Sequence, residues 1–102
     1  MKINRAKNPD SMIDFEKKHT PFIEKVSRKI IVSVGTEIEH PMNPEHYITW
    51  IELLLNGESL GVKELDNEDP PSATFELDKE PFPSDEIKAR ANCNLHGTWE
   101  SF

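Results

Sequence analysis

Histidine and cysteine side chains carry the most distinctive chemistry in this sequence of 102 residues. The chain contains four histidines and a single cysteine. Imidazole nitrogen and thiolate sulfur are favoured ligands of late first-row transition metals, so these side chains together predict a metal site. The candidate ligands are His19, His40, His46, Cys93 and His96.

The spacing of the histidines in the middle of the chain favours a shared target. His40 and His46 flank a segment that contains Pro41 and Pro44. Proline fixes its own φ and restricts the residue before it, so this connection is expected to be short and extended. Such a connection can direct both imidazoles at one point.

The remaining candidates also lie at turns or beside a proline. Cys93 and His96 are three residues apart, and Gly97 can adopt the positive φ of a tight turn. His19 comes shortly before Pro21. Each pair alone is weak evidence, because a lone cysteine is usually a small buried apolar residue. The metal prediction depends on all of them together.

Short apolar runs that alternate with polar residues predict the elements that position these ligands. The chain has eight prolines and four glycines that separate the runs. The predicted strands cover residues 29–34, 47–55, 59–65, 73–77, 86–93 and 98–102. Asn56-Gly57 suits a two-residue hairpin turn, and Cys93 shares the inward parity of Ala89 and Ala91.

This pattern favours an all-β fold, an antiparallel β-sandwich of about seven strands. No segment shows a convincing amphipathic helix. We expect residues 1–102 to form one domain, a common size for one. Residues 1–15 are expected to be an arm outside the core.

Composition excludes several classes of protein. The formal net charge of −7 argues against a nucleic-acid partner, which requires clustered Lys and Arg. No run approaches the roughly 18 apolar residues of a membrane-spanning helix, and the N-terminus lacks the apolar stretch of a signal peptide. We therefore expect a cytoplasmic protein without a membrane partner. A single cysteine excludes an intrachain disulfide.

The histidine and cysteine segments resemble those of the superoxide reductases of the neelaredoxin and desulfoferrodoxin type. That family carries His-Pro-Met followed by Glu-His-Tyr-Ile, and later Cys-Asn-x-His-Gly; here these are His40-Pro41-Met42, Glu45-His46-Tyr47-Ile48 and Cys93-Asn94-Leu95-His96-Gly97. The resemblance runs from about Glu16 to Trp99. It implies an immunoglobulin-like sandwich or barrel around one mononuclear iron, with the four histidines as equatorial ligands and Cys93 as the axial ligand.

The resemblance also implies a reaction. The iron would reduce superoxide to hydrogen peroxide without evolving oxygen, supplied with electrons by a rubredoxin-like protein. The axial thiolate would donate electron density to the iron, as a cysteine ligand does in haem enzymes. Relatives of this short type form dimers or tetramers, so a homo-oligomer is expected. The four-cysteine iron domain of the desulfoferrodoxin subclass is expected to be missing, because the chain has no other cysteine.

One position near His19 departs from the family pattern. Lys18 matches the lysine that the family uses, and it is expected to attract superoxide and to order a proton-donating water. Lys17 stands where the family has a glutamate that can close the sixth position of the oxidised iron. Glu16 is the neighbouring candidate. In an extended segment a shift of one residue turns the side chain away, so an open ferric site is expected.

Two other functions remain open from the sequence. In one, Cys93 and three histidines form a tetrahedral structural zinc site within an interaction module. In the other, the iron protein senses oxidants or carries electrons. The apolar strand Trp50–Leu55 fits either the core or an interface between subunits.

Overall fold

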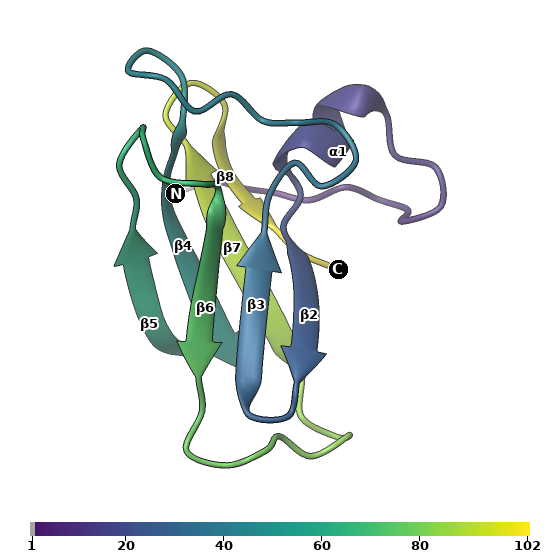
Figure 1. The fold of residues 1–102 in the computed structure, drawn as a ribbon. Helices are drawn as coiled ribbons and strands as arrows, with labels where there is room; N and C mark the ends of the chain where they lie inside the picture. Colours follow the sequence, from purple (N-terminus) through teal and green to yellow (C-terminus); the bar gives the residue numbers. More distant parts are fainter. Residues whose placement is uncertain (1) are drawn as a thin grey trace.

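Two β-sheets pack face to face in the computed structural model, which describes residues 2–102 (Figure 1). The five-stranded sheet has the order β1-β8-β7-β4-β5, and the three-stranded sheet has the order β2-β3-β6. The elements are β1 (Ile3–Asn4), α1 (Asp14–His19), β2 (Phe22–Val26), β3 (Lys29–Ser33), β4 (Ile48–Leu55), β5 (Glu58–Glu64), β6 (Ser72–Glu76), β7 (Ile87–Cys93) and β8 (Gly97–Glu100). The predicted β-sandwich is confirmed, and over the described residues the sheets do not close into a barrel.

The core lies between the sheets and is made by the strands whose alternation was visible in the sequence. In β3, Ile30 and Val32 are buried while their neighbours are not. In β7 the buried positions are Ala89, Ala91 and Cys93. The central pairing is antiparallel between β4 and β7, and Ile51 lies opposite Ala91. The apolar strand β4 therefore contributes mainly to the core.

Tight turns join several of these strands. Asn56 and Gly57 have φ values of 50° and 83°, the left-handed conformations that the predicted two-residue hairpin requires. Strands β2 and β3 are joined through Ser27, which also has a positive φ of 58°. These turns pair β2 with β3, and β4 with β5, in antiparallel register.

Three features differ from the sequence-based expectation. Strand β2 was not predicted, because within it Ile23 is the residue that packs against the core, so the strand shows no alternation. The sequence showed no convincing amphipathic helix, and the structure adds the short helix α1, whose six residues are too few to display an amphipathic period. The predicted arm is attached at its start, where β1 pairs in parallel with β8.

The two ends of the sandwich carry different connections. One end, here called the histidine end, carries α1, residues 34–47 and residues 94–96 (Figure 1). The opposite end, here called the turn end, carries residues 27–28, 56–57 and 77–86. Within residues 2–102 no helix is long and apolar enough to cross a membrane.

Candidate metal centre

Four of the five predicted ligands form one compact group at the histidine end. One ligand atom from each of His19, His40, His46 and Cys93 can be chosen so that all four lie within 4.8 Å of one another. The four residues come from the end of α1, the connection between β3 and β4, and the end of β7. Residues far apart in the sequence therefore converge on one point, as the spacing predicted.

The fifth candidate, His96, lies beside this group. Its Nδ1 is 3.8 Å from the Cys93 sulfur, and the residue as a whole is exposed. The four imidazoles form a closed ring of neighbours, because each ring contacts two others. The centroid distances are 4.8 Å for His19 to His40, 4.8 Å for His40 to His46, 5.1 Å for His46 to His96 and 5.0 Å for His96 to His19.

Adjacent rings in this cycle are nearly perpendicular, with interplanar angles of 72° to 83°. A cycle of four imidazoles with the Cys93 sulfur close to it can present five donors to one ion. Nitrogen and sulfur donors of this kind suit a transition metal.

Hydrogen bonds to the backbone set the orientation of two ligand rings. His19 Nδ1 lies 2.8 Å from the carbonyl oxygen of Phe15, and His40 Nδ1 lies 2.7 Å from that of Pro41. A carbonyl can only accept, so each Nδ1 carries the hydrogen and each Nε2 is left with a free lone pair. This is the tautomer that a histidine ligand needs.

The opposite ring nitrogens are buried without a partner. The Nε2 atoms of His19, His40 and His46 make no hydrogen bond to the described residues and are shielded from solvent. An unsatisfied buried polar atom costs about 1–3 kcal/mol. Three such atoms on residues that group together are explained if they bind a metal ion, so the residues fit a metal at this position.

Burial also keeps these imidazoles uncharged. Burial lowers the pKa of His40 to about 4; a hydrogen bond to Pro41 opposes this effect, and the charges of His19, His46 and Lys18 add to it. Burial likewise lowers the pKa of His19 and of His46. Neutral imidazole is the form that binds metals, so the site is in the binding state at neutral pH.

Asn94 joins the two ligand-bearing loops, a role that the sequence did not reveal. Its side-chain oxygen accepts a hydrogen bond from the backbone nitrogen of Tyr47 at 3.0 Å. Its Nδ2 donates to the carbonyl oxygen of Glu45 at 3.0 Å. These contacts flank His46 on both sides, so the residue after Cys93 fixes the loop that carries His46.

Gly35 makes close packing at His40 possible. Its φ is +75°, and a Cβ at this position would lie 2.5 Å from the backbone nitrogen of His40 and 3.0 Å from the carbonyl oxygen of Ile38. No side chain fits there without moving His40. Its place directly after the last residues of a strand was the available signal in the sequence.

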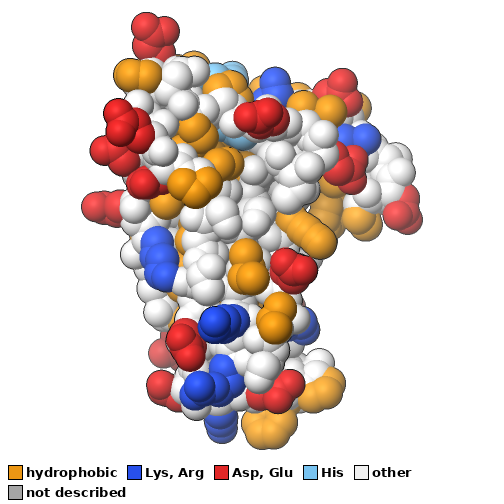
Figure 2. Space-filling view, viewed as in Figure 1, with side chains coloured by type: hydrophobic (Ala, Val, Ile, Leu, Met, Phe, Trp, Pro, Cys, Tyr) orange, Lys and Arg blue, Asp and Glu red, His pale blue; other side chains and the backbone are white. Residues whose placement is uncertain are grey.

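Lys18 is close enough to the histidines for its charge to act on them, whereas Lys17 is paired with an acidic side chain. The charge of Lys18 contributes to the lowered pKa of His19, His40 and His46, and no ion pair found among residues 2–102 involves it. Lys17 instead pairs with Glu37, with Nζ 3.3 Å from the carboxylate. Figure 2 shows histidine atoms at the surface of the histidine end beside a basic side chain.

Glu16 is committed to the start of the helix. Its Oε1 accepts a hydrogen bond from the backbone nitrogen of Ile13 at 3.1 Å. The extended segment expected here is wrong, because Asp14–His19 is helical. The hydrogen bond to Ile13 engages one carboxylate oxygen of Glu16.

An aromatic cluster supports the outer side of the site. The Phe15 ring lies 4.6 Å from the His19 ring, 5.0 Å from the His96 ring and 5.5 Å from the Trp99 ring, measured between centroids. Trp99 stacks on His19 at 5.2 Å with an interplanar angle of 23°. Packing of Phe15 on Trp99 thus connects α1 to β8.

The fold and this grouping define a small β-sandwich protein with a group of histidine and cysteine side chains at one end that could hold a metal ion. Comparison with known proteins extends this description. The family Desulfoferrodoxin matches residues 11–102 of the chain. This match covers most of the sequence, so the chain belongs to the desulfoferrodoxin family.

Individual relatives agree with this assignment. A desulfoferrodoxin homolog of Archaeoglobus fulgidus is 40% identical over 101 residues, which cover 99% of this chain and 73% of the relative. A superoxide reductase of Pyrococcus horikoshii is 39% identical over 98 residues, covering 82% of this chain and 84% of the relative. The predicted family and its enzyme class, an oxidoreductase, are confirmed.

A solved structure supports the same relationship in three dimensions. The superoxide reductase (neelaredoxin) from Archaeoglobus fulgidus in the reduced form superimposes with a TM-score of 0.76 at 28% identity. The superposition covers 97% of this chain and 94% of that chain. The arrangement of both sheets is therefore shared with an enzyme of the family.

Proposed function

We propose that this chain reduces superoxide to hydrogen peroxide at one mononuclear iron held by His19, His40, His46, Cys93 and His96. The observation that carries the proposal is the closed ring of four imidazoles beside a buried thiol, with three unpartnered Nε2 atoms. Relatives of the chain are named superoxide reductases, which supports the assignment.

The protein supplies a preorganised set of donors. The carbonyl oxygens of Phe15 and Pro41 hold His19 and His40 in the tautomer that leaves Nε2 free. Cys93 is 1% exposed, and such burial shields its sulfur from water. A bound iron supplies the electron for the reaction, in which superoxide takes up one electron and two protons to give hydrogen peroxide.

Lys18 is proposed as the residue that attracts the substrate. It is partly exposed and lies close enough to three histidines to affect their protonation. Lys17 is neutralised by Glu37, so Lys18 is the cation at this position that remains available for an anion. Its ammonium group can also hold the water that delivers the protons.

The electron must come from another molecule, and we propose a rubredoxin-like protein as the donor. The redox chemistry requires one electron for each superoxide, which a one-electron carrier matches. We further propose one domain over residues 1–102 and an assembly of identical subunits. Cross-linking and light scattering with and without the donor would test both associations.

Substitution of Cys93 tests the metal assignment most directly. Cys93→Ala should remove the sulfur-to-iron charge-transfer band and most of the activity, because no second thiol is available. Cys93→Ser provides the polar comparison, and circular dichroism of both variants would show whether the sheets are intact. Superoxide consumption without oxygen evolution, followed with an oxygen electrode, separates reduction from dismutation. Retention of band and activity in the alanine variant would overturn the ligand set.

A structural zinc site is the second candidate, and one observation favours it. The tight group within 4.8 Å contains three histidines and one cysteine, which is a tetrahedral zinc set, and it omits His96. The closed imidazole ring argues for five donors instead. Metal analysis of protein produced without added zinc distinguishes the two, because a zinc complex is colourless and an oxidised iron site is not.

A further inference from the structure

Strand β1 lies beside the proposed metal centre, although it precedes the part of the chain that the family matches. The match begins at residue 11, whereas β1 (Ile3–Asn4) adds to the edge of the larger sheet beside β8. The pairing is parallel, with Ile3 opposite Thr98 and Asn4 opposite Trp99. Strand β8 follows directly after the turn that carries Cys93 and His96, so the arm lies against the support of two proposed ligands.

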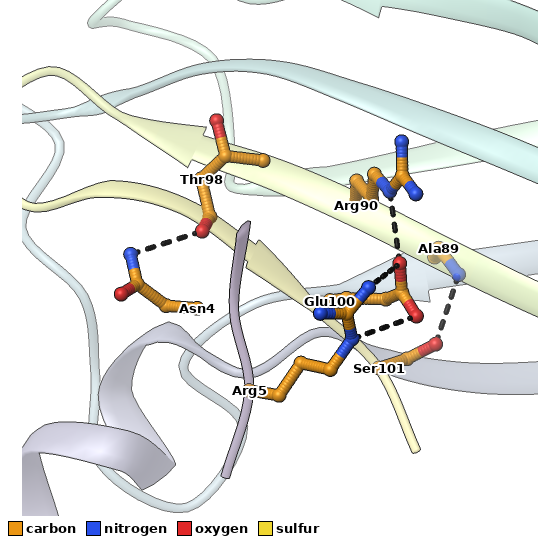
Figure 3. Close-up of polar contacts among 7 residues, drawn as sticks. All are labelled: Asn4, Arg5, Ala89, Arg90, Thr98, Glu100 and Ser101. Carbon is orange, nitrogen blue, oxygen red and sulfur yellow. Dashed lines mark hydrogen bonds and ion pairs between the residues drawn. The ribbon is translucent and has the colours of Figure 1, made fainter. Parts of the chain in front are cut away.

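The side chain of Asn4 spans this turn. Its Nδ2 donates to the carbonyl oxygen of Thr98 at 3.1 Å (Figure 3) and lies 3.5 Å from that of His96. These two carbonyls stand on either side of Gly97, whose φ is +80°. A Cβ on Gly97 would lie 3.3 Å from Asn4 Nδ2. The amide therefore packs directly over the bare α-carbon of the turn.

A second donor meets the same carbonyl from within the sheet. Trp99 Nε1 donates to the carbonyl oxygen of His96 at 3.1 Å. Trp99 also stacks on His19, so the backbone of one proposed ligand and the ring of another share a partner. Asn4 is the part of this support that comes from outside the family match.

Other contacts fasten the arm at a point away from the ligands. Arg5, which follows β1, and Arg90 of β7 both bond the carboxylate of Glu100, at 3.3 Å and 2.9 Å (Figure 3). Ala6 is buried, with 7% of its surface exposed. The arm thus has an anchor at Glu100 that is separate from the contact of Asn4 with the ligand turn.

We propose that Asn4 is a positioning residue for the metal centre: it fixes the Gly97 turn, and through it the backbone of His96 and the end of β7. The arm is then part of the support of the site. The inference rests on the proposed function only in treating His96 as a ligand. Its physical content is the restraint of the turn, which can be measured without activity.

The test compares two single substitutions in the arm. Asn4→Ala removes the contact with the turn, whereas Arg5→Ala loosens the same arm at Glu100 and leaves the turn contact in place. Both should lower the free energy of unfolding slightly. In the iron-loaded protein, Asn4→Ala should raise the rate of iron release to a chelator and the amide exchange of a peptide covering 94–99. We expect both rates to rise about 3- to 10-fold, which corresponds to the net free energy of one hydrogen bond.

Arg5→Ala should change both rates by less than about 2-fold. The Arg5 side chain is exposed, and an ion pair with an exposed partner contributes little to stability. Equal effects of the two substitutions, or no effect of Asn4→Ala on the exchange of the turn, would overturn the proposal. If the wild-type chain held no iron, the proposed function would fail. The exchange comparison would still decide whether Asn4 restrains the turn.

Discussion

At the turn end of the sandwich, two-residue turns such as Asn56-Gly57 join two of the strand pairs beside the longer connection 77–86, whereas at the histidine end the predicted histidine ligands lie on α1, the long connection 34–47 and the short turn 94–96. Each end relies on an asparagine and on a glycine whose φ is positive, yet for different purposes. Gly57 closes a hairpin with nothing within 4 Å of where its Cβ would lie, and the Asn56 side chain contacts Asp85 and Glu86 of the neighbouring loop. Gly35 and Asn94 instead position the loops that carry His40 and His46.

The comparison separates what folds the chain from what builds the site. A turn that only reverses the chain requires a permitted backbone conformation and little else. A loop that carries ligands must also hold its side chains within a fraction of an ångström by further contacts. Matched substitutions at the two ends should therefore affect stability in both cases and metal binding in only one.

The largest contrast is expected between Gly35→Ala and Gly57→Ala. Both place a side chain at a positive φ, of +75° and +83°, but the new Cβ meets the His40 backbone at 2.5 Å in one case and nothing within 4 Å in the other. We expect a loss of about 1–2 kcal/mol for Gly57→Ala from backbone strain. Gly35→Ala should lose about 2–4 kcal/mol and much of its iron, because overpacking adds to the strain. Urea unfolding and iron content per chain measure both. Full iron content in Gly35→Ala would show that the His40 loop adapts.

The asparagines provide the next comparison. Asn94→Ala removes the contacts with Tyr47 and Glu45, and Asn56→Ala removes those with Glu86 and Asp85. Each should reduce stability by about 1–2 kcal/mol. Only Asn94→Ala should accelerate iron release, by about 10-fold, the low end for a lost supporting contact. Chelator kinetics would check this, and equal release rates in the two variants would contradict the separation of the ends.

The features of the two ends that depend on local sequence pattern could be predicted from the sequence. Alternation in β7 placed Cys93 at the inward-facing end of a strand, and it is 1% exposed there. The Asn56-Gly57 hairpin followed from the conformations that these residues tolerate. The grouping of His19, His40 and His46 with the cysteine also matched the expectation. It could be predicted because the chain has few histidines and cysteines, so each of them was a candidate ligand.

The parts that could not be predicted depend on contacts between distant segments. Helix α1 has only six residues, and Phe15 on it packs against Trp99 and His96, more than eighty positions away. Without that packing no local signal separates a short helix from an arm. The same holds for Asn4, which meets its partners only because β1 pairs with β8.

Charge offers a weaker test of the two ends. Lys18 is close enough to the histidines for its charge to act on them, whereas Lys79 lies at the turn end with its Nζ 5.3 Å from the Phe82 ring centroid. Lys18→Ala should slow the reaction with superoxide by about 3- to 10-fold at low salt and flatten its dependence on ionic strength. Lys79→Ala carries the same change in net charge and should do neither. Pulse radiolysis at several salt concentrations measures both effects. Identical salt dependence in the two variants would mean that overall charge alone governs the encounter.

The smallest effect concerns ion pairs. Burial raises the pKa of Glu100, but hydrogen bonds and charges from Arg90 and Arg5 outweigh burial and hold the pKa below its ordinary value of 4.5. A carboxylate with a lowered pKa stabilises the fold above that ordinary value, and the contribution is lost as pH falls through the folded-state pKa. Glu100→Gln should therefore cost about 1 kcal/mol at neutral pH and progressively less in acid.

The matched pair at the turn end is Arg28 with Glu76, 3.5 Å apart, with 52% and 61% of the two side chains exposed. Exposure on both sides screens the attraction, so Glu76→Gln should change stability by less than about 0.5 kcal/mol at any pH. Urea unfolding of both variants and the wild type, at about pH 7 and about pH 3, gives the comparison. A wild-type advantage over Glu100→Gln that persisted undiminished in acid would mean that packing of the side chain, not its charge, stabilises this position beside the arm.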